Sequence, residues 1–234
     1  MSRSSQENIT CPKCGKDSSF TVWHSINTTL DPEMKAAVRD RSTFLFTCPH
    51  CDYKAHVDYG FLYHQMEDQI MIHYARSEEA FSEVYDFAAG KYENELLKDF
   101  PNVQAKYLNR IVRSMNQLLE KLAIFDAGLD DRIIEICKVL ILTEYQENHP
   151  ESRNIELLMF TNKENKHIIQ IIDSDETAGY VEITDNFYDS AIQFVGSGLK
   201  DIREDHEPLI DRAWALAYIS DELRKKHNKE GLNK

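Results

Sequence analysis

The chain has 234 residues and a formal net charge of −13, with 42% hydrophobic and 29% charged residues. This hydrophobic content is enough for a packed core, and the composition excludes a wholly disordered chain. No apolar run approaches the roughly 20 residues that a membrane-spanning helix needs, so we expect no association with a membrane.

Two short cysteine motifs dominate the first part of the chain: Cys11-Pro12-Lys13-Cys14 and Cys48-Pro49-His50-Cys51. Together they supply four thiolates, the number that a tetrahedral structural zinc site requires. The N-terminus has no hydrophobic segment, so we expect no export signal and a cytoplasmic location, where thiols stay reduced. We therefore predict that Cys11, Cys14, Cys48 and Cys51 bind Zn²⁺. Iron in a rubredoxin-like site is the main alternative, and two disulfides are the third.

Strands are predicted around both motifs, because apolar and polar residues alternate over residues 20–26 and 53–59, and Phe44 and Phe46 share one face before the second motif. Residues 70–74 suggest a further strand. Such half-buried strands are typical of an antiparallel sheet. One short helix interrupts them, with Asp31 as its cap and Pro32 at its first position. Gly15 allows a tight turn after the first motif, and Asp52 occupies the equivalent place after the second. This arrangement predicts a zinc ribbon with an inserted helix.

From about Ser77 the apolar residues recur at helical spacing. We predict a trailing helix that ends before a break at residues 99–102, and then a helix along the apolar stripe from Leu108 to Phe125. A further helix, capped by Asp130 or Asp131, should run to about Glu147. The predicted domains are thus residues 1–98, the zinc ribbon with its trailing helix, and residues 99–234.

Beyond His149-Pro150, three short apolar runs at residues 155–160, 167–173 and 180–183 predict a small β-meander. Helices are expected at residues 188–195 and from about Pro208 onward. Cys137 lies in an apolar helical pattern, which indicates a buried thiol without a chemical role. The predicted fold class is therefore α+β: an N-terminal zinc ribbon of antiparallel strands with an inserted short helix, then a helical region with a β-meander.

The two cysteine motifs resemble those of the CpXC domain family, which is named for them. Further similarities are the stretch from Asn27 to Pro32 and the Phe46-to-Cys51 approach, with Leu62-Tyr63-His64, Met71-Ile72 and the stretch from Arg113 to Lys138. The resemblance covers roughly residues 9–140. It implies a zinc-binding module with Cys11, Cys14, Cys48 and Cys51 as ligands, and it implies no particular activity.

A site with four cysteine ligands leaves no open position for water or substrate, so we expect a non-enzymatic protein without catalytic residues. Residues 77–234 hold 19 Lys and Arg against 31 Asp and Glu. This acidic part and the closed site favour a scaffold or adaptor that docks an unidentified protein or a second copy of itself. Nucleic-acid binding through the ribbon is one alternative, although the net charge disfavours it. The other is an enzyme with its site in the C-terminal part, around Asp211, Trp214 and Tyr218.

Overall fold

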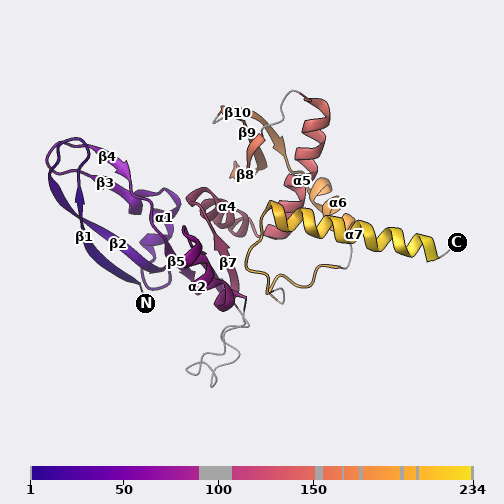
Figure 1. Cartoon of the computed structure of the whole chain (residues 1–234), viewed down its shortest axis with the longest axis horizontal. Helices are drawn as coiled ribbons and strands as arrows, with labels where there is room; N and C mark the ends of the chain where they lie inside the picture. Colours follow the sequence, from indigo (N-terminus) through magenta and orange to yellow (C-terminus); the bar gives the residue numbers. More distant parts are fainter. Residues whose placement is uncertain are drawn as a thin grey trace, which may run out of the picture. The chain divides into compact units, whose positions relative to one another are not determined.

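The computed structural model describes residues 2–89, 107–150, 155–164, 166–173, 176–195, 198–203 and 206–232. It is a mixed α and β structure (Figure 1). The chain divides into two compact units. Unit 1 comprises Met1–Leu118 and His206–Pro208, and unit 2 comprises Leu119–Asp205 and Leu209–Lys234. The boundary predicted at residues 98 and 99, and the predicted break at residues 99–102, lie outside the described residues.

Unit 1 is built on a five-stranded sheet in the order β1-β2-β5-β6-β7. Its strands are β1 (Arg3–Thr10), β2 (Asp17–Asn27), β5 (Phe61–Gln65), β6 (Ile70–Tyr74) and β7 (Leu108–Val112). The pairs β1–β2 and β5–β6 are antiparallel, whereas β2–β5 and β6–β7 are parallel. The sheet is therefore mixed, which differs from the predicted antiparallel arrangement.

The predicted strands around the cysteines are present as two antiparallel hairpins (Figure 1). The first pairs β1 with β2, and the second pairs β3 (Leu45–Thr47) with β4 (Lys54–His56). Strand β2 alternates at its start, where Ser18 and Phe20 are buried and Asp17 and Ser19 are exposed, but within the predicted stretch the residues Thr21, Val22 and Trp23 are all half-buried. The sequence reasoning gave no strand at β1, whose residues are mostly exposed and polar.

The predicted inserted helix is α1 (Glu33–Arg39), followed by the short 3₁₀ helix η1 (Ser42–Phe44). The helix begins one residue later than predicted, because Pro32 itself occupies the cap position and no side chain caps the helix. The carbonyl of Asp31 instead accepts a hydrogen bond from the backbone N–H of Met34 at 3.0 Å. Met34 and Val38 point one face of α1 into the core.

The trailing helix is α2 (Glu78–Ala88), capped by Ser77, whose side chain accepts from the backbone N–H of Ala80. The long helix predicted from Leu108 is wrong over its first part. Residues Leu108–Val112 form β7, which pairs in parallel with β6, and the helix α4 covers only Met115–Asp126. Leu108, Ile111 and Val112 fit a helical stripe, but they fit a buried strand equally well, and pairing with β6 decides between them.

Unit 2 contains α5 (Asp131–Asn148), the predicted meander, α6 (Asp185–Val195) and α7 (Arg212–Leu232). The meander strands are β8 (Ile155–Lys163), β9 (Lys166–Asp173) and β10 (Glu176–Glu182), antiparallel and in the order β10-β9-β8. Asp130 caps α5, as predicted. The core gathers buried side chains from α5 and the meander, among them Ile134, Phe160 and Ile169. No helix in the described ranges is long and apolar enough to cross a bilayer.

Charged side chains are buried where α5 meets the second half of α4. Lys138 donates to both carboxylate oxygens of Glu120 at 3.1 Å and to Glu135 at 3.0 Å. Lys121 lies 2.8 Å from a carboxylate oxygen of Asp131. Burial raises the pKa of Glu120. Burial lowers the pKa of Lys138, but Glu120 and Glu135 outweigh it, so that pKa is raised. Three carboxylates thus share two ammonium groups inside unit 2.

Candidate metal centre

The four cysteines of the two motifs lie in the loops of the two hairpins, one pair in each loop. In the first loop, the N–H of Cys11 donates to the carbonyl of Lys16 at 3.0 Å, and the N–H of Gly15 donates to the carbonyl of Cys11 at 2.9 Å. The second loop repeats this pattern, from Cys48 to Tyr53 at 2.9 Å and from Asp52 to Cys48 at 3.0 Å. The two motifs therefore fold into the same backbone turn.

Each turn closes through one residue in the left-handed region. Gly15 has φ of 70° and Asp52 has φ of 55°. The turn expected after both motifs is thus present in both. Glycine adopts this conformation at no steric cost, whereas an aspartate adopts it at a cost that is smaller than for most other residues.

The four sulfur atoms converge on one point. All four Sγ atoms lie within 4.8 Å of one another, with 3.7 Å between Cys11 and Cys51 and 3.7 Å between Cys14 and Cys48. A disulfide needs about 2.05 Å between its sulfurs, so these pairs are not disulfides. A tetrahedron of thiolates about 2.3 Å from a central zinc ion has edges of roughly 3.8 Å. The cluster therefore has the ligand set and the spacing that a tetrahedral metal ion needs.

One side of the cluster is closed by hydrophobic side chains. Cys11 and Cys48 are buried, and they pack with Phe20 and Phe46, whose rings meet edge to face at 6.1 Å. Cys14 is exposed. The hairpins thus hold two sulfurs in an apolar environment and leave one edge of the cluster open to solvent.

Because the thiols lie close together, their pKa values differ. Burial raises the pKa of Cys48, but hydrogen bonds from the backbone N–H of His50 and from the other three thiols outweigh it and lower the pKa to about 6. The backbone N–H of Tyr53 lowers the pKa of Cys51, and burial with the neighbouring sulfurs raises it to about 12. Each ionisation opposes the next, as expected for negative groups in contact. A cation bound at the centre would remove this opposition and release protons.

The other residues named from the sequence make contacts that belong to the fold rather than to a site. Cys137 is buried, and burial raises the pKa of its thiol to about 12. His50 is exposed and does not belong to the four-cysteine cluster. Asp211 accepts the backbone N–H of Trp214 at 2.9 Å near the start of α7, and the Trp214 ring stacks on Tyr218 at 5.3 Å. The structure therefore brings Asp211, Trp214 and Tyr218 together as a helix start and a ring contact.

Comparison with known proteins agrees with this geometry. The chain matches the family described as CpXC protein over residues 9–138, more than half of its length. This range includes both hairpins and their four cysteines. The searches of curated proteins and of solved structures found no match. On this match the chain belongs to the CpXC family.

Proposed function

We propose that Cys11, Cys14, Cys48 and Cys51 bind one structural Zn²⁺ ion, which joins the two hairpins into a zinc ribbon. The observation that carries the proposal is the convergence of four sulfurs at 3.7 Å, close to the edge of a zinc–thiolate tetrahedron. Each motif supplies two ligands from a preformed turn. The metal would therefore cross-link residues that lie far apart in the sequence, and it would stabilise a small module with few buried side chains.

Elemental analysis of the purified chain tests the metal. We expect one zinc per chain and none after Cys48→Ala, which removes a buried ligand. Cys137→Ala is the matched control, because it removes a buried thiol outside the cluster and should leave the zinc content unchanged. Iron in place of zinc would contradict the identity of the metal. Full zinc content in Cys48→Ala would contradict the ligand set.

For the protein as a whole we propose a non-enzymatic scaffold or adaptor. A four-cysteine site has no free coordination position, so the metal would serve the fold rather than a reaction. Unit 2 supports a docking role, because Leu216 and Leu223 on α7 are 52% and 51% exposed. They are seven residues apart and thus lie on the same side of the helix. These two leucines offer a small apolar surface, which supports contact with another protein.

Light scattering coupled to size exclusion, together with capture from the native host, tests the scaffold. We expect a defined complex, either a dimer of the chain or a stoichiometric pair with one other protein. The double variant Leu216→Lys with Leu223→Lys should lose it. Leu30→Lys, at a leucine of unit 1 that is 58% exposed, is the matched control and should retain it. A monomer that captures no partner would contradict the proposal.

A further inference from the structure

Unit 1 contains a cavity of about 400 Å³ that the metal centre does not use. Three arginines line it: Arg41, which precedes η1, Arg76, which follows β6, and Arg113, which follows β7. They lie far apart in the sequence, and the fold collects them around one space. In a chain with a net charge of −13, a concave site with three cations is a distinct electrostatic feature.

One of these cations is neutralised inside the cavity. Asp58 is the single carboxylate among the lining residues, and it lies 3.0 Å from the guanidinium of Arg76. It also accepts the hydroxyl proton of Tyr74 at 2.5 Å. Burial, together with Asp58, raises the pKa of Tyr74 to about 12, so this hydroxyl stays a donor. Asp58 is therefore already bonded on both oxygens. Arg113 pairs with Glu78 outside the lining, so Arg41 is the cavity arginine for which the described residues show no carboxylate partner.

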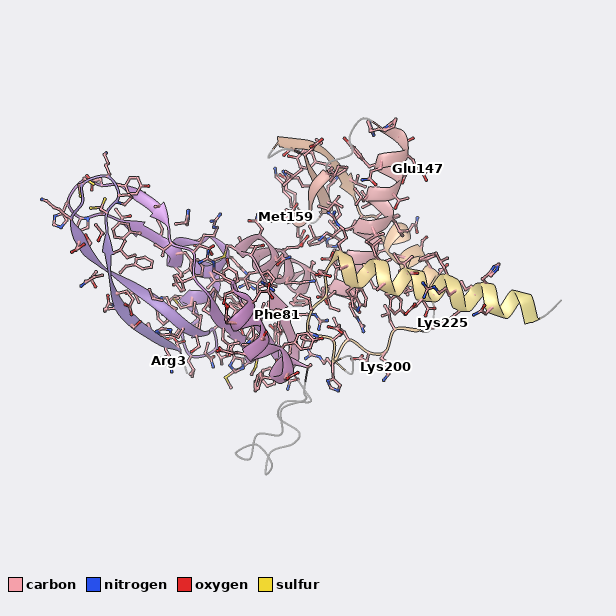
Figure 2. All side chains as sticks on the ribbon, in the orientation of Figure 1. Arg3, Phe81, Glu147, Met159, Lys200 and Lys225 are labelled. Carbon is pink, nitrogen blue, oxygen red and sulfur yellow. The ribbon has the colours of Figure 1, made fainter. Side chains whose placement is uncertain are left out.

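The other two arginines keep unused donors. The buried Nε of Arg41 and the buried Nε of Arg113 have no hydrogen-bond partner among the described residues. Arg113 is otherwise held in place, since its Nη2 donates to Glu78 at 2.5 Å and its guanidinium lies 4.9 Å from the ring of Phe81, which Figure 2 labels on α2. Buried donors without partners are rare and costly in folded proteins, so an acceptor that reached either one would lower that cost.

The first turn of α4 supplies further donors to the same space. Ser114, Met115 and Asn116 line the cavity at the N-terminus of this twelve-residue helix. Ser114 accepts the N–H of Gln117 at 3.2 Å, so its hydroxyl proton is available to an acceptor. In this turn the N–H of Met115 already donates to Tyr74 and that of Gln117 to Ser114, so it is the positive end of the helix dipole that favours an anion.

We propose that this cavity binds the phosphate group of a small phosphorylated molecule, held by Arg41 and Arg113 and by the first turn of α4. Guanidinium groups suit phosphate because their planar donors bond two oxygens at once. A volume of about 400 Å³ exceeds the need of a phosphate alone and lies in the range of pockets for small organic ligands. Phe44 and Val57 provide apolar wall for the remainder of the molecule. The cavity does not depend on the proposed scaffold role. It would add a small phosphorylated ligand to that role.

Calorimetric titration of the full, metal-loaded chain at physiological salt tests the proposal. Ribose 5-phosphate, inorganic phosphate and succinate are the three probes, chosen to separate a phosphate ester from free phosphate and from a carboxylate. We expect saturable one-to-one binding of ribose 5-phosphate, weaker binding of phosphate and none of succinate. Arg41→Gln should weaken the binding on the order of tenfold or more, because it removes an arginine with no acidic partner among the described residues.

Two further variants are compared with Arg41→Gln. Arg224→Gln makes the same charge change on an exposed arginine of unit 2 and should leave binding unchanged. Asp58→Asn removes the carboxylate of the cavity and should tighten binding several-fold, which a damaged fold would not do. No saturable binding at millimolar concentration, equal affinity in Arg41→Gln and Arg224→Gln, or equal or weaker binding in Asp58→Asn would overturn the proposal. Binding of an oligonucleotide without binding of ribose 5-phosphate would also overturn it, in favour of a nucleic-acid surface.

Discussion

At the scale of single residues, the two cysteine turns differ at one equivalent position, occupied by Gly15 in the first and Asp52 in the second. Both residues have positive φ and make the same backbone hydrogen bond. An added Cβ at Gly15 would meet no atom within 4 Å. The cost of a side chain at either position is therefore the backbone conformation itself, without a steric clash.

We expect Asp52→Gly to stabilise unit 1 by about 1 kcal/mol, because glycine adopts this conformation without strain. Gly15→Ala is the mirror experiment and should destabilise the unit by a similar amount. Denaturant unfolding of the metal-loaded chain measures both changes. A destabilised Asp52→Gly protein would show that the aspartate side chain contributes more than its backbone costs.

His73 is the second residue for which we expect a measurable effect, here on the pH dependence of stability, because it is only 8% exposed in β6. Burial lowers its pKa to about 4, against about 6.5 in an unfolded chain. Between these values the unfolded chain binds a proton that the folded chain does not. Stability should therefore fall as the pH drops from about 6.5 to 4, by up to about 3 kcal/mol from this group.

His73→Phe removes this contribution and keeps an aromatic ring beside Phe87, which His73 meets at 5.7 Å. Its unfolding free energy should depend less steeply on pH between 4 and 6.5 than that of the wild type. The exposed His206, changed to phenylalanine, is the control. Parallel pH profiles for wild type and His73→Phe would show that His73 titrates normally.

At the scale of secondary-structure elements, the buried ions between α4 and α5 make a sharper prediction than the surface pairs do. Lys138 has a side chain 10% exposed and contacts two carboxylates. Lys138→Met should leave three buried carboxylates with Lys121 as their one ammonium group and cost about 3–5 kcal/mol. Lys166→Met breaks the exposed pair with Glu182 and should cost under about 1 kcal/mol.

Thermal unfolding of unit 2, followed through Trp214, compares the two lysine variants. If Lys138→Met lost no more stability than Lys166→Met, water or a proton would have to replace the buried ammonium group. The double variant Lys138→Met with Glu120→Gln should recover part of the lost stability, because it removes one uncompensated charge.

The elements show where sequence reasoning succeeds and where it fails. The β-meander, α5 and α6 follow local patterns of apolar residues, so they could be predicted. The strand β7 could not, since its side chains match helical spacing and its pairing partner β6 lies beyond residues 90–106 in the sequence. Ser114 and Gln117 do carry a helix-start signature three residues apart, which places the beginning of α4 after β7.

The metal centre and the arginine cavity also differ in whether the sequence predicts them. The four cysteines could be predicted as one cluster because each motif carries its own turn and ligand spacing. The arginine cavity could not be predicted, because Arg41, Arg76 and Arg113 share no motif, and only the packing of unit 1 brings them together.

At the scale of the whole molecule, removal of the metal should act on one part of the chain. With a chelator of high zinc affinity, we expect the hairpins β1–β2 and β3–β4 to lose protection from hydrogen exchange. The strands β8–β10 of unit 2 have their own core and should keep it. Equal loss of protection in both units would show that they unfold together.

The path of the backbone adds a last consequence. Residues 206–208 belong to unit 1, where Pro208 accepts the backbone N–H of Ile111 at 2.8 Å and Glu207 accepts from Arg110 at 3.1 Å. Unit 2 thus interrupts unit 1 in the sequence, and β7 at the edge of the sheet depends on a segment encoded almost a hundred residues later. During synthesis, the cysteine hairpins can form early, but the sheet to which they belong is completed only after most of the chain has left the ribosome.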